Sequence, residues 1–226
     1  EWLSLDGTQV VNLTPIAGMT GMTTLSLPVT QVADLTPIAN MTAMTTFDAG
    51  GTQITDLTPI AGMTGMTELD LWGTPAEDFQ FLSGMSHLEI LDLTATGITD
   101  LSHLPRDAVF RYLNVSGTLI IDLRPLTQLH FNADPDRINI RFAQCAAATA
   151  DPKIAEIAEI EDNAERSAKL LAYLADWEPP TDTDPDGGDL LAVGIQNDKL
   201  EVAESLPTEA ERDERLKQVL HQRLIP

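Results

Sequence analysis

Apolar residues recur along this chain at a fixed interval of 22 residues. Each unit opens with a short apolar-x-apolar segment, the alternation that is typical of a half-buried β-strand. A single unit of this length cannot bury its apolar side, whereas stacked units share one continuous interior, so the repeat predicts a solenoid. The first apolar position of the six units is Leu3, Leu25, Phe47, Leu69, Leu91 and Leu113.

The second half of each unit predicts a compact return segment. Three units carry Leu-Thr-Pro-Ile, at 13–16, 35–38 and 57–60, followed by apolar residues at three-residue steps. All seven methionines fall in two of these columns, and we expect them to fill the interior. A threonine follows every strand, where its hydroxyl can satisfy backbone groups of a turn. These threonines are at 8, 30, 52, 74, 96 and 118.

The two halves together resemble the bacterial, internalin-like class of leucine-rich repeats. The strand half is represented by residues 66–74 (Met-Thr-Glu-Leu-Asp-Leu-Trp-Gly-Thr) and the return half by residues 52–60 (Thr-Gln-Ile-Thr-Asp-Leu-Thr-Pro-Ile). This chain departs from the family pattern in using Thr where Asn is usual, Met where Leu is usual, and a degenerate return segment at 75–82. The resemblance implies an α/β leucine-rich repeat solenoid, right-handed, with one parallel sheet on a concave face that binds protein. It implies no chemistry.

The chain is expected to divide into four parts. Residues 1–132 form six leucine-rich coils, and residues 133–178 supply a last strand at 138–142 and a helical cap that begins at Asp151-Pro152. Residues 179–189 have the composition of an acidic linker. Residues 190–226 predict a helical segment at the start of a further region. Its amphipathic stretch at 208–224 needs a partner, which could be the solenoid, a second copy of the chain through self-association, or, as we favour, a continuation of the chain.

Residues 182–189 also match the first half of a calcium-binding loop. The twelfth position of that loop is Val193 where a calcium site has Glu, so the sequence favours a flexible linker.

Charge narrows the classes of partner. The chain carries 35 acidic and 13 basic residues, a formal net charge of −22, and residues 1–105 contain no Lys or Arg. Nucleic acid and anionic membrane surfaces are therefore disfavoured, and a protein or peptide with a basic face is expected. The single Cys145 excludes an internal disulfide, which is typical of a cytoplasmic protein. An extracellular location would require an upstream signal peptide that has been removed.

The outward positions of the predicted strands supply the candidate binding site. Three aspartates stack in the middle outward column, with large aromatic residues nearby, and exposed aromatics ringed by acids are typical interface anchors. The alternative is that aspartate is only a soluble filler of this repeat position. A straight column lacks the converging ligands of a cation site, so no metal is expected. The predicted partner-binding residues are Asp48, Glu68, Asp70, Trp72, Asp92, Tyr112 and Asn114.

A second polar column precedes each return segment and predicts helix capping instead of binding. Its members are Asn12, Asp34, Asp56, Asp78, Asp100 and Asp122.

No phosphate loop, zinc-ligand spacing or nucleophile elbow occurs in the sequence, so no catalytic residue and no cofactor is expected in this chain. The sequence therefore favours a non-enzymatic recognition module. Two alternatives stay open. One is a regulatory or substrate-selecting segment of a larger multidomain enzyme, and the other is a surface adhesin.

Overall fold

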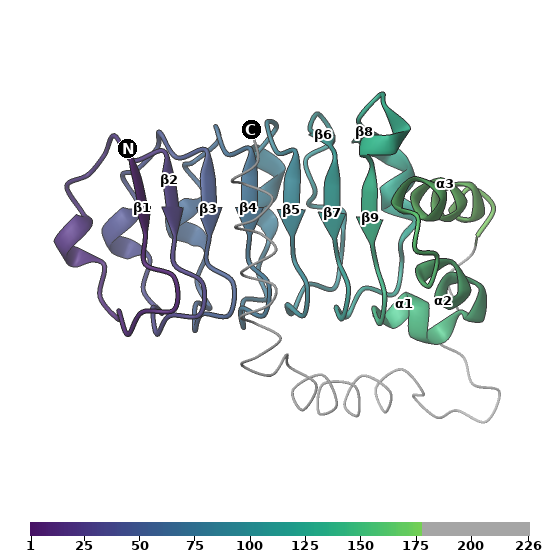
Figure 1. Ribbon diagram of the computed structural model, residues 1–226, viewed down its shortest axis with the longest axis horizontal. Helices are drawn as coiled ribbons and strands as arrows, with labels where there is room; N and C mark the ends of the chain where they lie inside the picture. The colour runs from purple at the N-terminus through teal and green to yellow at the C-terminus, as the bar shows by residue number, and fades with distance from the viewer. Residues whose placement is uncertain (178–226) are drawn as a thin grey trace. The chain divides into compact units, whose positions relative to one another are not determined.

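The computed structural model describes residues 1–177, and within them seven parallel strands form one sheet in chain order (Figure 1). The predicted linker, the calcium half-motif and the 208–224 helix lie outside the described residues. The four-part division of the chain stays a prediction. The strands of the sheet are β1 (Trp2–Ser4), β2 (Thr24–Ser26), β3 (Thr46–Asp48), β4 (Glu68–Asp70), β5 (Ile90–Asp92), β7 (Tyr112–Asn114) and β9 (Asn139–Arg141).

Single turns of 3₁₀ helix form the return segments opposite the sheet. Proline occupies the first turn in five of them, η1, η2, η3, η5 and η6, where its fixed φ suits the turn and its missing N–H is not needed. The Leu-Thr-Pro-Ile prediction is thereby confirmed. The turns are η1 (Thr14–Ile16), η2 (Thr36–Ile38), η3 (Thr58–Ile60), η4 (Gln80–Gly84), η5 (Arg124–Gln128) and η6 (Pro135–Arg137).

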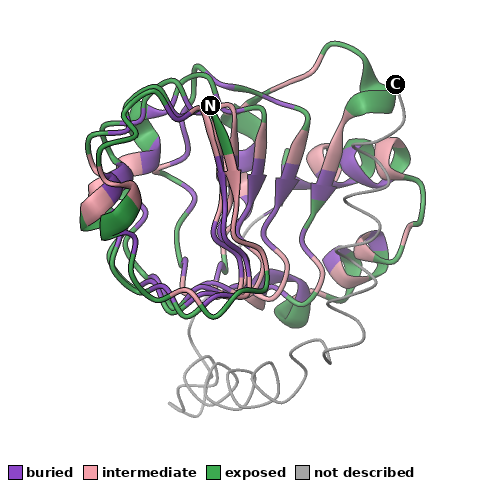
Figure 2. Cartoon of the chain, turned by 60° about the vertical axis from the view of Figure 1, so that its left-hand side comes forward, coloured by how far each residue is buried: buried purple, intermediate pink, exposed green. Residues whose placement is uncertain are grey.

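The interior consists of columns of identical positions, because neighbouring strands pair in register at a spacing of one repeat. Leu25 pairs with Phe47 and Phe47 with Leu69, and all three are fully buried. The buried positions run through successive coils as bands between strands and return segments (Figure 2). The methionine prediction is confirmed for six residues and wrong for Met19, which is 38% exposed. Met19 belongs to the first coil, on whose outer side no described coil packs.

The post-strand threonines close each turn as the sequence predicts. The hydroxyl of Thr52 donates to the carbonyl of Ala49 at 2.7 Å, and the threonines at 8, 30, 74, 96 and 118 make the same bond three residues back at 2.6–2.9 Å. Backbone bonds then join one coil to the next at matching positions, as from Leu27 N–H to the carbonyl of Asp48 at 2.8 Å. These bonds fix the orientation of each coil on its neighbour.

The last full coil departs from the repeat. Leu113 pairs with Ile140, 27 residues later, whereas Leu91 pairs with Leu113 after 22. The longer coil forms a second parallel pair, β6 (Val109–Phe110) with β8 (His130–Phe131), which the sequence analysis did not predict. The predicted last strand is confirmed as β9.

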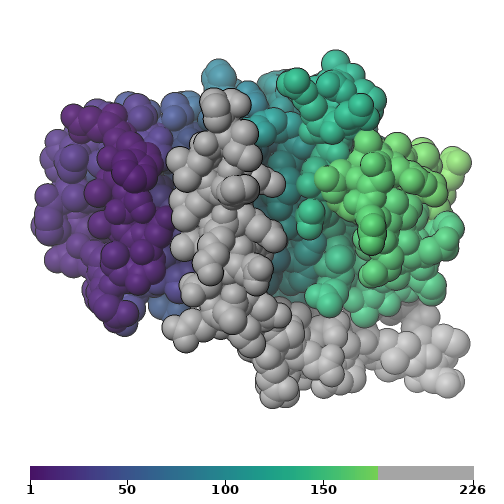
Figure 3. Space-filling view, viewed as in Figure 1, coloured from purple at the N-terminus to yellow at the C-terminus, as the bar shows by residue number. Residues whose placement is uncertain are grey.

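Up to residue 177, three helices follow β9: α1 (Ala146–Ala150), α2 (Pro152–Ala158) and α3 (Asn163–Leu174). In the space-filling view they continue the stack of coils at its C-terminal end (Figure 3). The predicted start at Asp151-Pro152 is confirmed, since the Asp151 carboxylate accepts from the N–H groups of Lys153 and Ile154. Trp177 is buried beside these helices' other apolar residues. Helix α1 was missed because its Ala-rich sequence lacks an apolar period.

A buried arginine joins the helical cap to the sheet. Arg166 of α3 is 6% exposed, and its guanidinium donates to the carbonyls of Ile140 at 3.1 Å and Ile160 at 2.6 Å. It also donates to the side-chain oxygens of Asn139 and Asn163, at 2.7 and 2.6 Å. Its contacts are thus with neutral oxygens, which satisfy the donors without a carboxylate.

Substitution Arg166→Met is expected to lower the free energy of unfolding by about 3 kcal/mol, because several carbonyl and amide oxygens lose their donor inside the protein. Urea denaturation followed by circular dichroism measures this. The exposed Arg137, paired with Asp134, supplies the control: Arg137→Met should cost less than about 0.5 kcal/mol. Equal losses in the two variants would contradict the structural role of Arg166.

One turn position after each strand has a left-handed backbone. Glycine occupies it at 7, 51, 73 and 117, with φ of 64–66°, but Val29 and Ala95 adopt φ of 55° at the same position. A β-branched residue is strained there because its side chain crowds the backbone.

Val29→Gly is therefore expected to stabilise the protein by about 1 kcal/mol, the relief of strain exceeding the added entropy of the unfolded chain. The reciprocal change is Gly7→Val, where a new Cβ would meet no atom within 4 Å and only the backbone penalty counts. It should destabilise by about 1–2 kcal/mol in the same urea titration. A destabilised Val29→Gly variant would refute this account of the turn.

Candidate functional site

The outward side of the sheet, here called the strand face, carries the seven predicted binding residues. Strand pairing places Asp48 beside Asp70, Asp70 beside Asp92, and Asp92 beside Asn114. Glu68 of β4 pairs with Ile90 of β5, and both belong to the column of outward residues next to that of the aspartates. The predicted residues of β3 to β7 thus occupy adjacent strands in the expected order.

The middle column of the strand face also shapes the turns that follow the strands. Asp48 accepts the N–H of Gly50 at 3.1 Å, Asp70 that of Trp72 at 3.1 Å, and Asp92 that of Thr94 at 2.9 Å. The amide oxygen of Asn114 makes the same bond to Ser116, at 3.1 Å. An uncharged amide therefore suffices for this bond, and the negative charge of the three aspartates is not required by it.

The C-terminal part of the predicted site is a hydrogen-bonded group. The Tyr112 hydroxyl donates to Asp92 Oδ2 at 3.0 Å, and Asn114 Nδ2 donates to the same oxygen at 3.3 Å and to the Tyr112 hydroxyl at 3.1 Å. Asp92 is 3% exposed and Asn114 4% exposed. Burial, followed by the negative charge of Asp92, raises the pKa of Tyr112 well above its ordinary value of 10.0, so the phenol is a neutral donor.

The sequence predicts exposed aromatic side chains here, and that part of the expectation is wrong: Trp72 and Tyr112 are both half-buried. Trp72 covers the glycine pair of the preceding coil, and a Cβ added at Gly50 would overlap its indole ring. A Cβ added at Gly51, where φ is 65°, would lie 2.9 Å from the same ring. The Gly-Gly sequence one repeat before a tryptophan was the signal for this packing.

Sequence reasoning missed two residues of the strand face. β9 pairs with β7, so Asn139 extends the column of Tyr112 and Arg141 extends the column of Asn114. The longer spacing of the last coil hid this register, although the strand itself was expected. Arg141 is exposed and places a positive charge at the end of the aspartate column.

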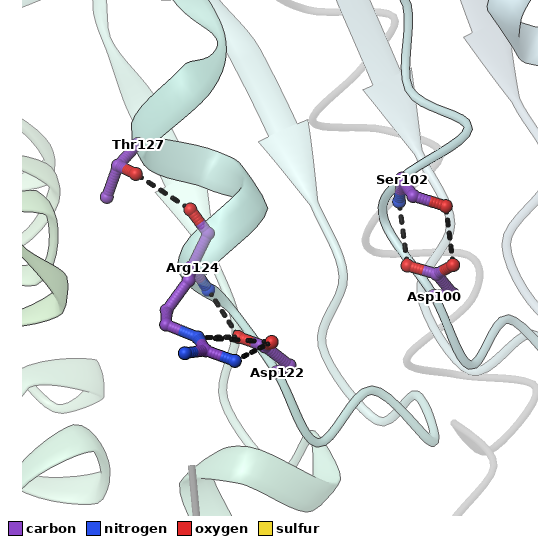
Figure 4. A network of polar contacts seen from close by, with 5 residues as sticks. All are labelled: Asp100, Ser102, Asp122, Arg124 and Thr127. Atoms are coloured by element: carbon purple, nitrogen blue, oxygen red, sulfur yellow. Dashed lines mark hydrogen bonds and ion pairs between the residues drawn. The ribbon is translucent and has the colours of Figure 1, made fainter. Parts of the chain in front are cut away.

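The second polar column caps the return segments, as predicted (Figure 4). Asp100 accepts the N–H of Ser102 at 2.8 Å, and Asp122 accepts that of Arg124 at 2.9 Å and pairs with its guanidinium at 2.8 Å. Hydrogen bonds from the residue two positions later lower the pKa values of four of these carboxyls below the ordinary 3.8. These are Asp34, Asp56, Asp100 and Asp122.

The thiol of Cys145 is buried, and the imidazole of His130 lies beside a backbone carbonyl. Burial raises the pKa of the Cys145 thiol to about 11, and His130 Nδ1 lies 2.7 Å from the carbonyl of Arg106. Residues 1–177 contain no group of three or more His, Cys, Asp or Glu side chains arranged to hold a metal ion. The same range contains no helix that is long and apolar enough to cross a membrane.

Solved structures with the same fold include two internalins from Listeria monocytogenes. InlF is 24% identical, with a TM-score of 0.52 over 60% of this chain and 38% of its own. Internalin C2 is 26% identical, with a TM-score of 0.54 over 62% of this chain and 59% of its own. A leucine-rich repeat protein of Leptospira interrogans is 16% identical, with a TM-score of 0.53 over 63% of this chain and 36% of its own.

This chain therefore spans less than two thirds of the length of each internalin that it matches. It matches no protein-family model and none of the curated proteins.

The capping carboxylates predict a loss of stability in acid. Their folded-state pKa values are depressed, so their contribution is complete above about pH 4 and is lost as the pH falls through the folded values. Thermal unfolding should show this decline. Low pH also protonates the other carboxylates of the chain and so relieves the repulsion among them. The wild type is therefore compared with a variant in which all four capping aspartates are replaced by Asn.

Asparagine keeps the acceptor, as Asn12 does for Thr14 N–H at 2.8 Å, but it does not titrate. The quadruple variant should therefore lose less stability between pH 5 and pH 3 than the wild type. An equal or larger loss would contradict the assignment of the acid-labile contribution to these four carboxylates.

Proposed function

From the fold of an internalin-like leucine-rich repeat protein, we propose that this chain is a non-enzymatic recognition module whose strand face binds a basic segment of a protein partner. The observation that carries the proposal is the column of aspartates on β3, β4 and β5, beside Glu68 and half-buried Trp72. Residues 1–105 contain no Lys or Arg, so the outward residues of β1 to β5 are all acidic or uncharged.

The aspartates are well placed to select cations. A backbone N–H holds one oxygen of each carboxylate, which fixes the direction of the side chain before any partner arrives. Neighbouring strands are about 4.8 Å apart, so Asp48 and Asp70 present two carboxylates at that interval. Lysine or arginine side chains of a partner that crosses the strands would meet them in succession.

Trp72 and Tyr112 give the same surface an apolar component. Trp72 is held flat by Gly50 and Gly51, and Tyr112 is held by Asp92 and Asn114, so neither ring must be ordered when a partner binds. A basic residue could stack its stem on the indole while its charge meets Asp70. Rigid aromatic rings beside oriented charges are typical of interface centres.

The experiment removes charge and keeps the turn hydrogen bonds of the two aspartates. In the variant Asp48→Asn/Glu68→Gln/Asp70→Asn, the amide oxygens can still accept the turn bonds, as Asn114 does. Proteins captured from a lysate of the source cells by the wild type should be lost by this variant. The captured partner should be basic, and its binding should weaken about tenfold or more between 50 and 300 mM salt.

A matched control removes three charges elsewhere. Glu77, Asp107 and Glu159 are exposed and lie outside the strand face, so Glu77→Gln/Asp107→Asn/Glu159→Gln lowers the net charge equally. This variant should retain the partner. If both triple variants bind alike while remaining folded, the strand face is not the binding surface.

A further inference from the structure

The middle column of the strand face changes sign along the stack. Its order, fixed by strand pairing, is Ser4, Ser26, Asp48, Asp70, Asp92, Asn114 and Arg141. Two neutral residues are followed by three acids, an amide and a base. Within residues 1–177, Arg141 is the one base in this column.

Most bases on the described surface pair with a nearby acid at 2.7–3.3 Å, namely Arg111, Arg124, Arg137, Lys153 and Lys169. Among the described residues, Arg106 and Arg141 are exposed without such a pair, and Arg141 is the one that lies in a strand of the main sheet. The exposed guanidinium of Arg141 makes no ion pair or hydrogen bond with any described residue. In a chain with 35 acids, an unpaired base on the proposed binding surface is available to an external anion.

A second positive charge lies close to it. Arg166 donates to neutral carbonyl and amide oxygens, and no carboxylate of residues 1–177 is hydrogen-bonded to its guanidinium. Burial, and then the positive charge of Arg141, lower the pKa of Arg166, while the charge of Asp162 acts in the opposite direction. The two cations therefore act on one another, and an anion bound to Arg141 would relieve their repulsion.

The acidic and basic ends of the column do not neutralise each other. Three strand spacings separate Asp70 from Arg141, a distance of about 14 Å. Asp92, which lies between them, accepts hydrogen bonds from Thr94, Tyr112 and Asn114. The face consequently presents two separate charged sites of opposite sign.

We propose that Arg141 binds a carboxylate of the partner, so that the segment on the strand face has basic side chains over Asp48 and Asp70 and an acidic residue about 14 Å further along. This proposal rests on the proposed function. In an extended segment the two charges would be four or five residues apart. A carboxylate fits the planar guanidinium fork, and the acidic half of the face disfavours a polyanion.

The test uses the full chain and a phage library of random dodecapeptides, so the natural partner need not be identified first. Peptides selected by the wild type should contain Lys or Arg and, four or five residues away, Asp or Glu. Arg141→Gln should select peptides that keep the bases, with Asp and Glu falling to the library frequency. The Arg141 side chain makes no hydrogen bond or ion pair with a described residue, so the variant should fold, which circular dichroism verifies.

A double-mutant cycle then isolates the pair. Replacing the acid of the best peptide by its amide should weaken binding to the wild type about two- to fivefold and leave binding to Arg141→Gln unchanged. Equal weakening on both proteins overturns the proposal. A phosphoserine peptide that binds the wild type more than tenfold better than the acidic peptide, through Arg141, would also overturn it in favour of a phosphorylated partner.

The outcomes separate the two proposals. Selected peptides with bases but no positioned acids would contradict the role of Arg141 and leave the acidic strand face standing. Peptides without bases, or no selected peptides at all, would count against both.

Discussion

The structure depends on in-register stacking of parallel coils. Every coil from β1 to β7 adds 22 residues, so each interior side chain meets its own counterpart and each backbone carbonyl meets the same donor of the next coil. This constraint places Phe47 between Leu25 and Leu69 and aligns the three strand-face aspartates. Repetition of the sequence unit places like charges in one column. The packing of the interior and the hydrogen bonds of the turns offset the repulsion between these charges.

The turns show how one side chain can serve structure and recognition together. The aspartate bond to the N–H two residues later explains a polar acceptor at the middle position, but Asn114 makes the same bond without charge. If the aspartates were only soluble fillers of this repeat position, that would explain why the column is polar. It would not explain why the column is negatively charged. In the second coil, the residue two positions after the middle outward position is Pro28, which has no N–H to donate. The middle position there is Ser26, whose hydroxyl donates to Asp6 at 2.6 Å.

Periodicity in the sequence was enough to predict the first six strands of the main sheet, the interior columns and the capping aspartates, and the Asp151-Pro152 pair predicted the start of the cap. What it could not predict depends on contacts outside the repeat. Trp72 packs over two glycines that precede it by one coil, and Met19 is exposed because it lies in an end coil. Arg141 was missed because five additional residues in the last coil shift its place in the sequence. The seven candidate residues lie together as expected, while their role in binding stays a proposal.

The central claim, that the acidic strand face is the surface that meets a partner, is tested most directly by site-specific photo-crosslinking. A photoreactive residue would replace Thr46, which lies on the strand face beside Glu68, or Thr42, which is exposed in a return segment. The account predicts that a captured basic partner crosslinks from position 46 and not from position 42. Crosslinking from position 42 alone would contradict it and would place the partner on the return segments.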